Sequence, residues 1–472
     1  MLSQKAKVNT FTGNTVWIFL TRFFPTLANT LVLIFFSRQL DTDTYGAYQN
    51  FWVQLLLLST LGALGLQSFL FTYTPDVLAA IIKRFKTKQY IQLSIWVILL
   101  GMVFAWLQAD KISLPVSIVF LVVYSFTVIA ESILLAFRYL KGIVVMNMLH
   151  MLVFLLIHYV FLTGILSFNW LFVALLLLYV VKLLVCAVWV NGNVKKHYQP
   201  ATEIAIESIR NLWLHMGLYD VLQIVFKYID KFIISILLAE SVSAIYYNGS
   251  QDVPFLPILL GAVGGAALMQ LSADKAEDAP VVVMNKTARI LSALVFPVFF
   301  FLVCFRYELF TVILTNRYEA SVPIFLMSIL VLPLRACNFT VVLQNKHKGK
   351  LINKGAVLDM VLACILMYPL YLLMGLPGVA LSFVVSTYIQ AAYYLYHTSH
   401  ILGVQWYRLL PVTNWCTKLI IFAIAFISIH YWLSTVFESQ IVLIWGVILT
   451  IITALVTFII EFKTVKRIYG NA

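Results

Sequence analysis

The chain has 472 residues, of which 62% are hydrophobic and 11% are charged, and its mean hydropathy is +0.96. A soluble protein cannot bury so much apolar surface, so the composition predicts an integral membrane protein. The net charge of +13 is dispersed over short connecting segments, a pattern that favours membrane topology over nucleic-acid binding.

Apolar stretches of about 20 residues, the length that crosses a bilayer, recur along the sequence. We expect about fourteen membrane-spanning helices, near 13–37, 46–72, 90–108, 113–136, 144–166, 170–190, 210–238, 244–272, 288–313, 320–343, 355–375, 377–397, 412–434 and 441–462. The break near 376 rests on Gly375, Pro377 and Gly378. Lys and Arg of the connecting segments divide roughly 22 against 4 between the two sides. The positive-inside rule therefore predicts a multi-pass protein of the cytoplasmic (inner) membrane with both termini cytoplasmic.

A polar connection at 191–209 separates the sixth and seventh expected spans. We expect an all-α fold with two pseudo-symmetric six-helix lobes, 1–205 and 206–400, and two additional helices in 401–472. A weak repeat supports the division, because Tyr246 follows Tyr48 by 198 residues and Ala244 matches Gly46. Spacing repeated between halves is typical of transporters whose site lies between them. The short outer connections leave no room for a catalytic domain, so we expect no enzyme activity.

Polar residues interrupt several spans of the first half. Arg22 and Asn29 lie seven residues apart, on one stripe of the first span, and Pro25 between them should kink or loosen the helix. Arg22 can also snorkel to the cytoplasmic face. Glu131 lies in the fourth span and Lys182 in the sixth.

The seventh span carries the densest group of charges, Asp220, Lys227, Asp230 and Lys231. A charge at the bilayer centre costs roughly 2.5–3.5 kcal/mol, so such residues usually face a bundle interior or a wet cavity. Asp220, Lys227 and Lys231 share one helical stripe, and Asp230 can pair with Lys227. The group is either an internal salt bridge that fixes packing or a polar path for an anionic cargo.

In the second half, Asp252 follows the start of the eighth span and Arg335 lies deep in the tenth, beside Pro333. Over both halves the deep cations slightly outnumber the deep anions. A cavity lined by Arg and Lys suits a cargo that carries phosphate or diphosphate.

Other candidate groups have structural interpretations. His150 and His158, on the fifth span, are able to titrate near neutral pH, but we favour satisfied core histidines. Asp41 and Asp43 form a DxD in a short outer connection, which we interpret as a solvated turn. The five cysteines show no metal-ligand spacing, and nucleotide-binding and hydrolase motifs are absent. We therefore expect no metal, cofactor or catalytic residue.

The segment FFSRQLDTDTYGAYQNFW resembles the first outer turn of polysaccharide exporters, in which a leucine and acidic or small residues precede Tyr-Gly and an aromatic residue. The matching residues are Leu40, Asp41, Asp43, Tyr45, Gly46 and Tyr48. Tyr228-Ile229-Asp230-Lys231 followed by Ala244-Ile245-Tyr246 is similar to the family's second such stretch, with Ala244 in place of the usual glycine. These exporters belong to the multidrug/oligosaccharidyl-lipid/polysaccharide flippase superfamily.

The resemblance implies a flippase that turns polyprenyl-diphosphate-linked oligosaccharide across the membrane by alternating access, for O-antigen, capsule or exopolysaccharide synthesis. It implies membrane lipids, a polysaccharide polymerase and chain-length machinery as partners. On this hypothesis Arg22, Asn29, Lys227, Lys231 and Arg335 contact the headgroup. The acidic residues Asp220, Asp230, Asp252 and Glu131 would serve in pairing or ion coupling.

Three alternatives remain open. A multidrug exporter of the same superfamily should show a dominant acidic site, which the deep cations argue against. A flippase for the lipid-linked peptidoglycan precursor shares the architecture and is poorly separated by sequence. A membrane polymerase or glycosyltransferase would need a sizeable outer catalytic loop.

Overall fold

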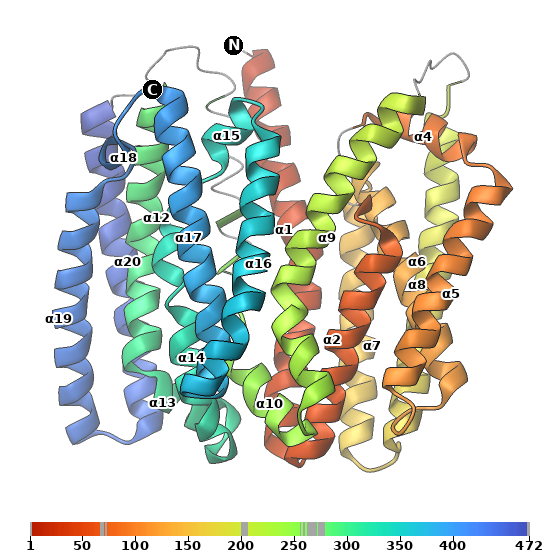
Figure 1. Ribbon diagram of the computed structural model, residues 1–472, viewed down its shortest axis with the longest axis horizontal. Coiled ribbons are helices and arrows are strands. Elements are labelled where there is room, and N and C mark those ends of the chain that lie inside the picture. Colours follow the sequence, from red (N-terminus) through yellow and green to blue (C-terminus); the bar gives the residue numbers. More distant parts are fainter. Residues whose placement is uncertain are drawn as a thin grey trace. The chain divides into compact units, whose positions relative to one another are not determined.

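The computed structural model describes residues 2–66, 70, 73–199, 206–254, 256–257, 260–261, 271 and 279–469. Within these ranges the secondary structure is helical, which confirms the all-α fold class (Figure 1). The chain divides into two compact units, Met1–Ala244 and Ile245–Ala472.

The first unit is a bundle of long helices with one short amphipathic helix, α4. Its elements are α1 (Leu2–Gln39), α2 (Thr42–Ala63), α4 (Pro75–Arg84), α5 (Thr87–Leu107), α6 (Leu114–Ala136), α7 (Leu140–Leu162), α8 (Phe168–His197), α9 (Ile206–Leu237) and the start of α10 (Glu240–Gly249). Helix α1 packs on α7, α6 on α5 and α8, and α9 on α2.

The second unit combines long helices with a broken central segment. Its elements are α12 (Ala279–Cys304), α13 (Arg306–Leu309), the π-helical turn η1 (Phe310–Leu314), the 3₁₀ turn η2 (Asn316–Ser321), α14 (Val322–Ile329), the 3₁₀ turn η3 (Leu332–Ala336), α15 (Val341–Asn345), α16 (Gly349–Met374), α17 (Leu376–Leu402), α18 (Trp406–Leu409), α19 (Val412–Val436) and α20 (Ser439–Tyr469). Helices α16 and α17 form a hairpin that turns at Gly375, whose φ of 66° explains the glycine and confirms the break predicted near 376.

Ten helices of the described ranges are long and apolar enough to cross a membrane. They are α1 from Phe19 onward, α5, α6, α7, α8, α12, α16, α17, α19 and α20. This set supports a polytopic membrane protein.

Several of the expected spans are not single helices, and the one at 288–313 comprises the end of α12, α13 and η1. Two others are interrupted near a proline. The span expected at 244–272 is interrupted, because α10 ends at Gly249 and the residues before Pro254 are not helical. The span expected at 320–343 is divided into α14, η3 and α15, with extended backbone at Cys337. Proline explains both corrections, since Pro254 and Pro333 cannot donate a helical hydrogen bond and restrict the preceding residue.

Neighbouring helices complete the backbone at two of the prolines that lie inside long helices, Pro25 and Pro297. Pro25 leaves the carbonyl of Thr21 without its helical donor, and the Asn147 amide of α7 donates to that oxygen at 3.0 Å. In the second unit Pro297 leaves the Ala293 carbonyl free, and the Thr457 hydroxyl of α20 donates to it at 2.9 Å. These contacts let α1 and α12 continue through their prolines, as the lack of water in a bilayer core requires.

The DxD of the first outer connection caps two helices. Asp41 accepts hydrogen bonds from the backbone N–H groups of Asp43 and Thr44 at the start of α2. Asp43 accepts from the backbone N–H of Ser241 at the start of α10, at 3.2 Å. The two carboxylates therefore do more than the solvated turn that we predicted, because they fix the first turns of two helices.

Candidate functional site

A polar cavity of about 130 Å³ lies inside the first unit. It is bounded by α1, α6, α7 and α8, and it is lined by Pro25, Ala28, Asn29, Tyr124, Thr127, Val128, Glu131, His150, Met151, Phe154, Tyr179 and Lys182. The structure thus brings together Asn29, Glu131 and Lys182, which the sequence had placed on three separate spans.

An ion pair forms the charged wall of this cavity. Lys182 Nζ lies 2.8 Å from Glu131 Oε1, and the two side chains are 8% and 22% exposed. In a buried pair of this kind each charge neutralises the other. Removing one partner leaves an unpaired charge and typically costs about 3–5 kcal/mol of stability. Glu131 of α6 and Lys182 of α8 are therefore paired with each other in the structure.

Aromatic rings line another part of the cavity, and the Tyr179 ring centroid lies 6.0 Å from Lys182 Nζ. The rings of Tyr124 and Tyr179 lie 5.1 Å apart, and His150 meets Tyr179 at 4.9 Å in an edge-on arrangement. The Trp52 ring of α2 lies 6.3 Å from each tyrosine ring. The cavity therefore combines charged, hydrogen-bonding and aromatic surfaces.

The two histidines of α7 have different environments. His158 Nδ1 lies 2.7 Å from the Phe154 carbonyl and its Nε2 lies 2.8 Å from the Tyr48 hydroxyl, so both ring nitrogens are satisfied and the prediction of a core histidine is confirmed. His150 Nδ1 is buried and meets no hydrogen-bond partner among the described residues. His150 is therefore available to a molecule in the cavity.

Helix α9 carries the charges that the sequence emphasised. Asp230 is 5% exposed, and its carboxylate lies 3.4 Å from Lys231 Nζ. Lys227 is exposed, with its ammonium 5.4 Å from the Tyr228 ring centroid, and Asp220 is half-buried. Arg22 and Asn29 are exposed on α1. The first unit thus presents exposed cations on two helices.

In the second unit Arg335 lies in η3, where the expected tenth span is broken, and it is exposed. The positive charge of Arg335 interacts electrostatically with Asp359 of α16. Asp359 is buried beside the hydroxyls of Ser386 and Thr387. Asp252 is exposed in the non-helical segment after α10. The sequence did not single out Asp359, because it falls only a few residues inside its expected span.

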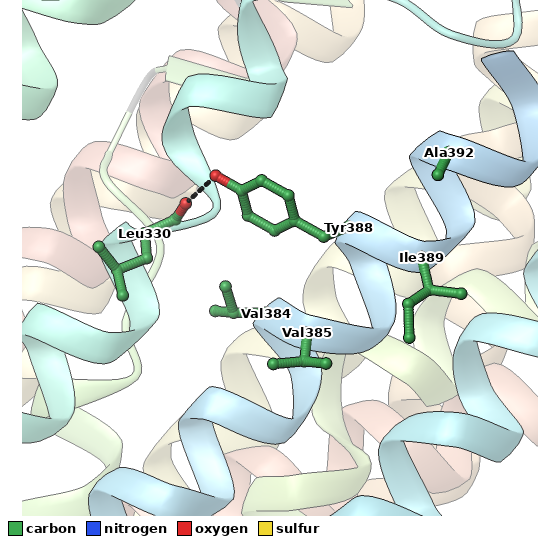
Figure 2. Close-up of a pocket in the computed structure, with 6 residues that line it drawn as sticks. All are labelled: Leu330, Val384, Val385, Tyr388, Ile389 and Ala392. Carbon is green, nitrogen blue, oxygen red and sulfur yellow. Dashed lines mark hydrogen bonds between the residues drawn. The ribbon is translucent and has the colours of Figure 1, made fainter.

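The broken segment also borders an apolar cavity of about 480 Å³ (Figure 2). Figure 2 shows the Tyr388 hydroxyl of α17 directed at the Leu330 carbonyl, to which it donates at 3.0 Å. Leu330 follows the last residue of α14, so a side chain replaces the helical donor that the break removes.

A further ionic group joins α12, α19 and α20. Glu461 Oε1 accepts from Lys418 at 3.1 Å and from the Asn414 amide at 2.7 Å, and its Oε2 lies 3.6 Å from Arg289. Sequence reasoning missed this group because Arg289 and Glu461 lie close to the expected span ends. The group anchors the two carboxy-terminal helices to the second unit.

No family model and no curated protein matches the chain. Solved structures do match it. The lipid II flippase MurJ, in an inward closed conformation, aligns over 95% of this chain and 99% of its own, with a TM-score of 0.67 and 13% identity. An inward-facing multidrug resistance MATE family transporter of the MOP superfamily aligns over 80% and 94%, with a TM-score of 0.53 and 16% identity. The chain shares the fold of these transporters.

Proposed function

We propose that the protein is a flippase that moves polyprenyl-diphosphate-linked oligosaccharide repeat units across the cytoplasmic membrane for surface polysaccharide synthesis. The observation that carries the proposal is the shared fold with a lipid II flippase over 95% of the chain. Exposed cations on α1, α9 and η3 add the chemistry that a diphosphate needs.

Each group of site residues has a distinct proposed role. Arg22, Lys227 and Arg335 are exposed and contact the diphosphate or headgroup, together with Lys231. The acidic residues Asp220, Asp230, Asp252 and Glu131 act as pairing or coupling partners. Because Lys231 and Lys182 are already paired with carboxylates, their charges are held in place before the cargo arrives.

Alternating access is the proposed mechanism. In it, 1–205 and 206–400 form two lobes, and the helices of 401–472 accompany the second lobe. The asymmetry of basic residues supports an orientation with both termini cytoplasmic. The sugar headgroup crosses in a wet polar cavity while the lipid tail stays in the bilayer.

A lipid-linked peptidoglycan precursor is the second candidate cargo, and the match to the lipid II flippase favours it. A multidrug exporter is less well supported, because the carboxylate that lines the cavity of the first unit, Glu131, is already paired with Lys182. A cationic drug entering that cavity would meet the lysine as well as the glutamate.

Deletion of the gene in its host tests the proposal. Complete lipid-linked repeat units should accumulate while surface polysaccharide is lost. Accumulation of the peptidoglycan precursor would instead favour the second candidate. Unchanged lipid intermediates together with increased drug sensitivity would contradict both flippase assignments.

A further inference from the structure

The cavity of the first unit has room for a small polar molecule. Its volume of about 130 Å³ is roughly ten times the about 10–15 Å³ that one water molecule needs. Asn29, one of its lining residues, is exposed on α1, so the cavity has a polar residue at its mouth. Its size admits one sugar ring or a smaller group and excludes an oligosaccharide.

The charges of the cavity exclude an ionic occupant. Glu131 and Lys182 are 2.8 Å apart and cancel each other. A metal cation at the carboxylate would have to displace the Lys182 ammonium, and an anion at the ammonium would have to displace Glu131. A neutral occupant with both donors and acceptors can bond to the pair without separating it.

The remaining walls suit a carbohydrate. The rings of Tyr124, Tyr179 and Phe154 offer apolar faces for the C–H surface of a sugar ring. His150 Nδ1 is buried without a partner among the described residues, and Asn29 offers an amide donor and acceptor. Apolar walls with a few fixed polar groups are the usual composition of a small-molecule site.

We propose that this cavity is a subsite for one neutral sugar residue of the translocated headgroup, with Glu131 and Lys182 bonding its hydroxyl or acetamido groups. The inference rests on the proposed function, and it separates sugar recognition from diphosphate recognition. Arg22 lies seven residues before Asn29, two helical turns or about 10 Å along α1, so one headgroup can reach both.

Binding of free sugars to the purified full-length protein in nanodiscs tests the subsite. Saturation-transfer NMR would be measured with glucose, galactose, rhamnose and N-acetylglucosamine. At least one of these sugars should bind saturably to the wild-type protein. Absence of binding by all four would overturn the subsite.

Three variants test whether the sugar binds in the cavity of the first unit. The double variant Glu131→Gln with Lys182→Met removes both charges together, so no lone charge stays buried, and it should weaken binding at least tenfold. Asn29→Ala, at an exposed position, should weaken it several-fold. Asn193→Ala is the matched control on α8, because its amide bonds to the Trp189 carbonyl of its own helix, and it should bind sugar as the wild type does.

Unchanged sugar binding in the double variant and in Asn29→Ala would also overturn the subsite. If the double variant fails to fold, Asn29→Ala decides the matter alone. The deletion experiment does not depend on this cavity. Lipid-linked repeat units that accumulate in the deletion strain, without sugar binding by the protein, would therefore reject the subsite and keep the proposed function.

Discussion

Lys231 and Asp230 are neighbours in sequence whose side chains pair within α9, and Asp230 is 5% exposed. Truncating Lys231 alone would leave a buried carboxylate without that partner, at a cost of about 3–5 kcal/mol. A test of function at this position therefore has to separate the loss of the cation from the loss of stability.

Arg22→Ala and Lys231→Ala should abolish export while the protein stays in the membrane, because the diphosphate loses its cationic contacts. The double variant Asp230→Asn with Lys231→Gln removes the pair without leaving a lone charge, and it should also fail to export. Surface polysaccharide and membrane protein level would be measured together. Normal export by both single variants would contradict the assignment, and Lys231→Arg should retain export.

Asp41 provides a pH-dependent contribution to stability outside the spans. Hydrogen bonds from the Thr44 backbone N–H lower the pKa of its carboxyl, so its ionised form is favoured in the folded protein. The stabilisation is present above the unfolded pKa of about 3.9 and is lost as pH falls through the lower folded value. Asp41→Ala should cost about 1 kcal/mol near neutral pH. Thermal unfolding of both proteins across pH should show this difference vanish in strong acid; a constant difference would contradict the cap.

Single residues were only partly predictable from the sequence. Charges in apolar stretches identified Glu131, Lys182, Asp230 and Lys231, because the cost of burying a charge makes each exceptional. Their partners were harder to predict, because the pairing of a residue on α6 with one on α8 depends on how the helices pack. The group of Arg289, Lys418 and Glu461 was missed because charges near expected span ends resemble snorkelling residues.

At the scale of elements, two of the internal prolines, Pro25 and Pro297, show how helices are joined. The carbonyls freed by Pro25 and Pro297 are each taken by a side chain of another helix, Asn147 and Thr457. The bilayer core holds no water that could donate a hydrogen bond to an unsatisfied carbonyl. Each contact therefore satisfies the backbone of one helix and holds the neighbouring helix against it.

Asn147→Leu should destabilise the first unit by about 1–3 kcal/mol, because it leaves the Thr21 carbonyl unsatisfied. Asn193→Leu is the control, since its amide bonds only within α8, and it should change stability by less than about 0.5 kcal/mol. Thermal unfolding in detergent compares the two. Equal unfolding midpoints would show that the Thr21 carbonyl finds another partner.

Gly46 permits the close approach of α2 and the start of α10. A Cβ at this position would lie 2.0 Å from the Glu240 carbonyl oxygen, so the backbones would have to separate. Gly46→Ala should therefore destabilise the protein by about 1–3 kcal/mol. Gly192→Ala has open space around its added Cβ and should stabilise α8 by up to about 1 kcal/mol. Unfolding midpoints that shift in the same direction would contradict this contrast.

Most long helices were predictable because about 20 apolar residues in sequence define a span. The expected spans at 90–108 and 113–136 lie within a few residues of α5 and α6. The spans containing Pro254 and Pro333 were predicted as continuous helices because each apolar stretch is long enough to cross a bilayer. That length was given more weight than the proline inside it. At the break near Pro333 the Tyr388 hydroxyl of α17 donates to the Leu330 carbonyl, a contact between helices that the sequence does not reveal.

At the scale of the whole molecule, the shared fold with a lipid II flippase and a MATE family transporter establishes the architecture, and the charges support the proposed cargo. Exposed Arg and Lys favour an anionic headgroup, and the neutralised pair of the first unit favours uncharged sugars. The proposed cargo, a lipid-linked oligosaccharide with a diphosphate, combines both features.

The most direct test of this account is translocation in proteoliposomes that contain the purified protein and lipid-linked repeat units isolated from the deletion strain. An enzyme that modifies the sugar only from outside would report how much substrate is exposed. We predict that inner-leaflet repeat units become accessible faster with the wild-type protein than with Arg22→Ala or without protein. Equal rates in all three preparations would contradict the central claim.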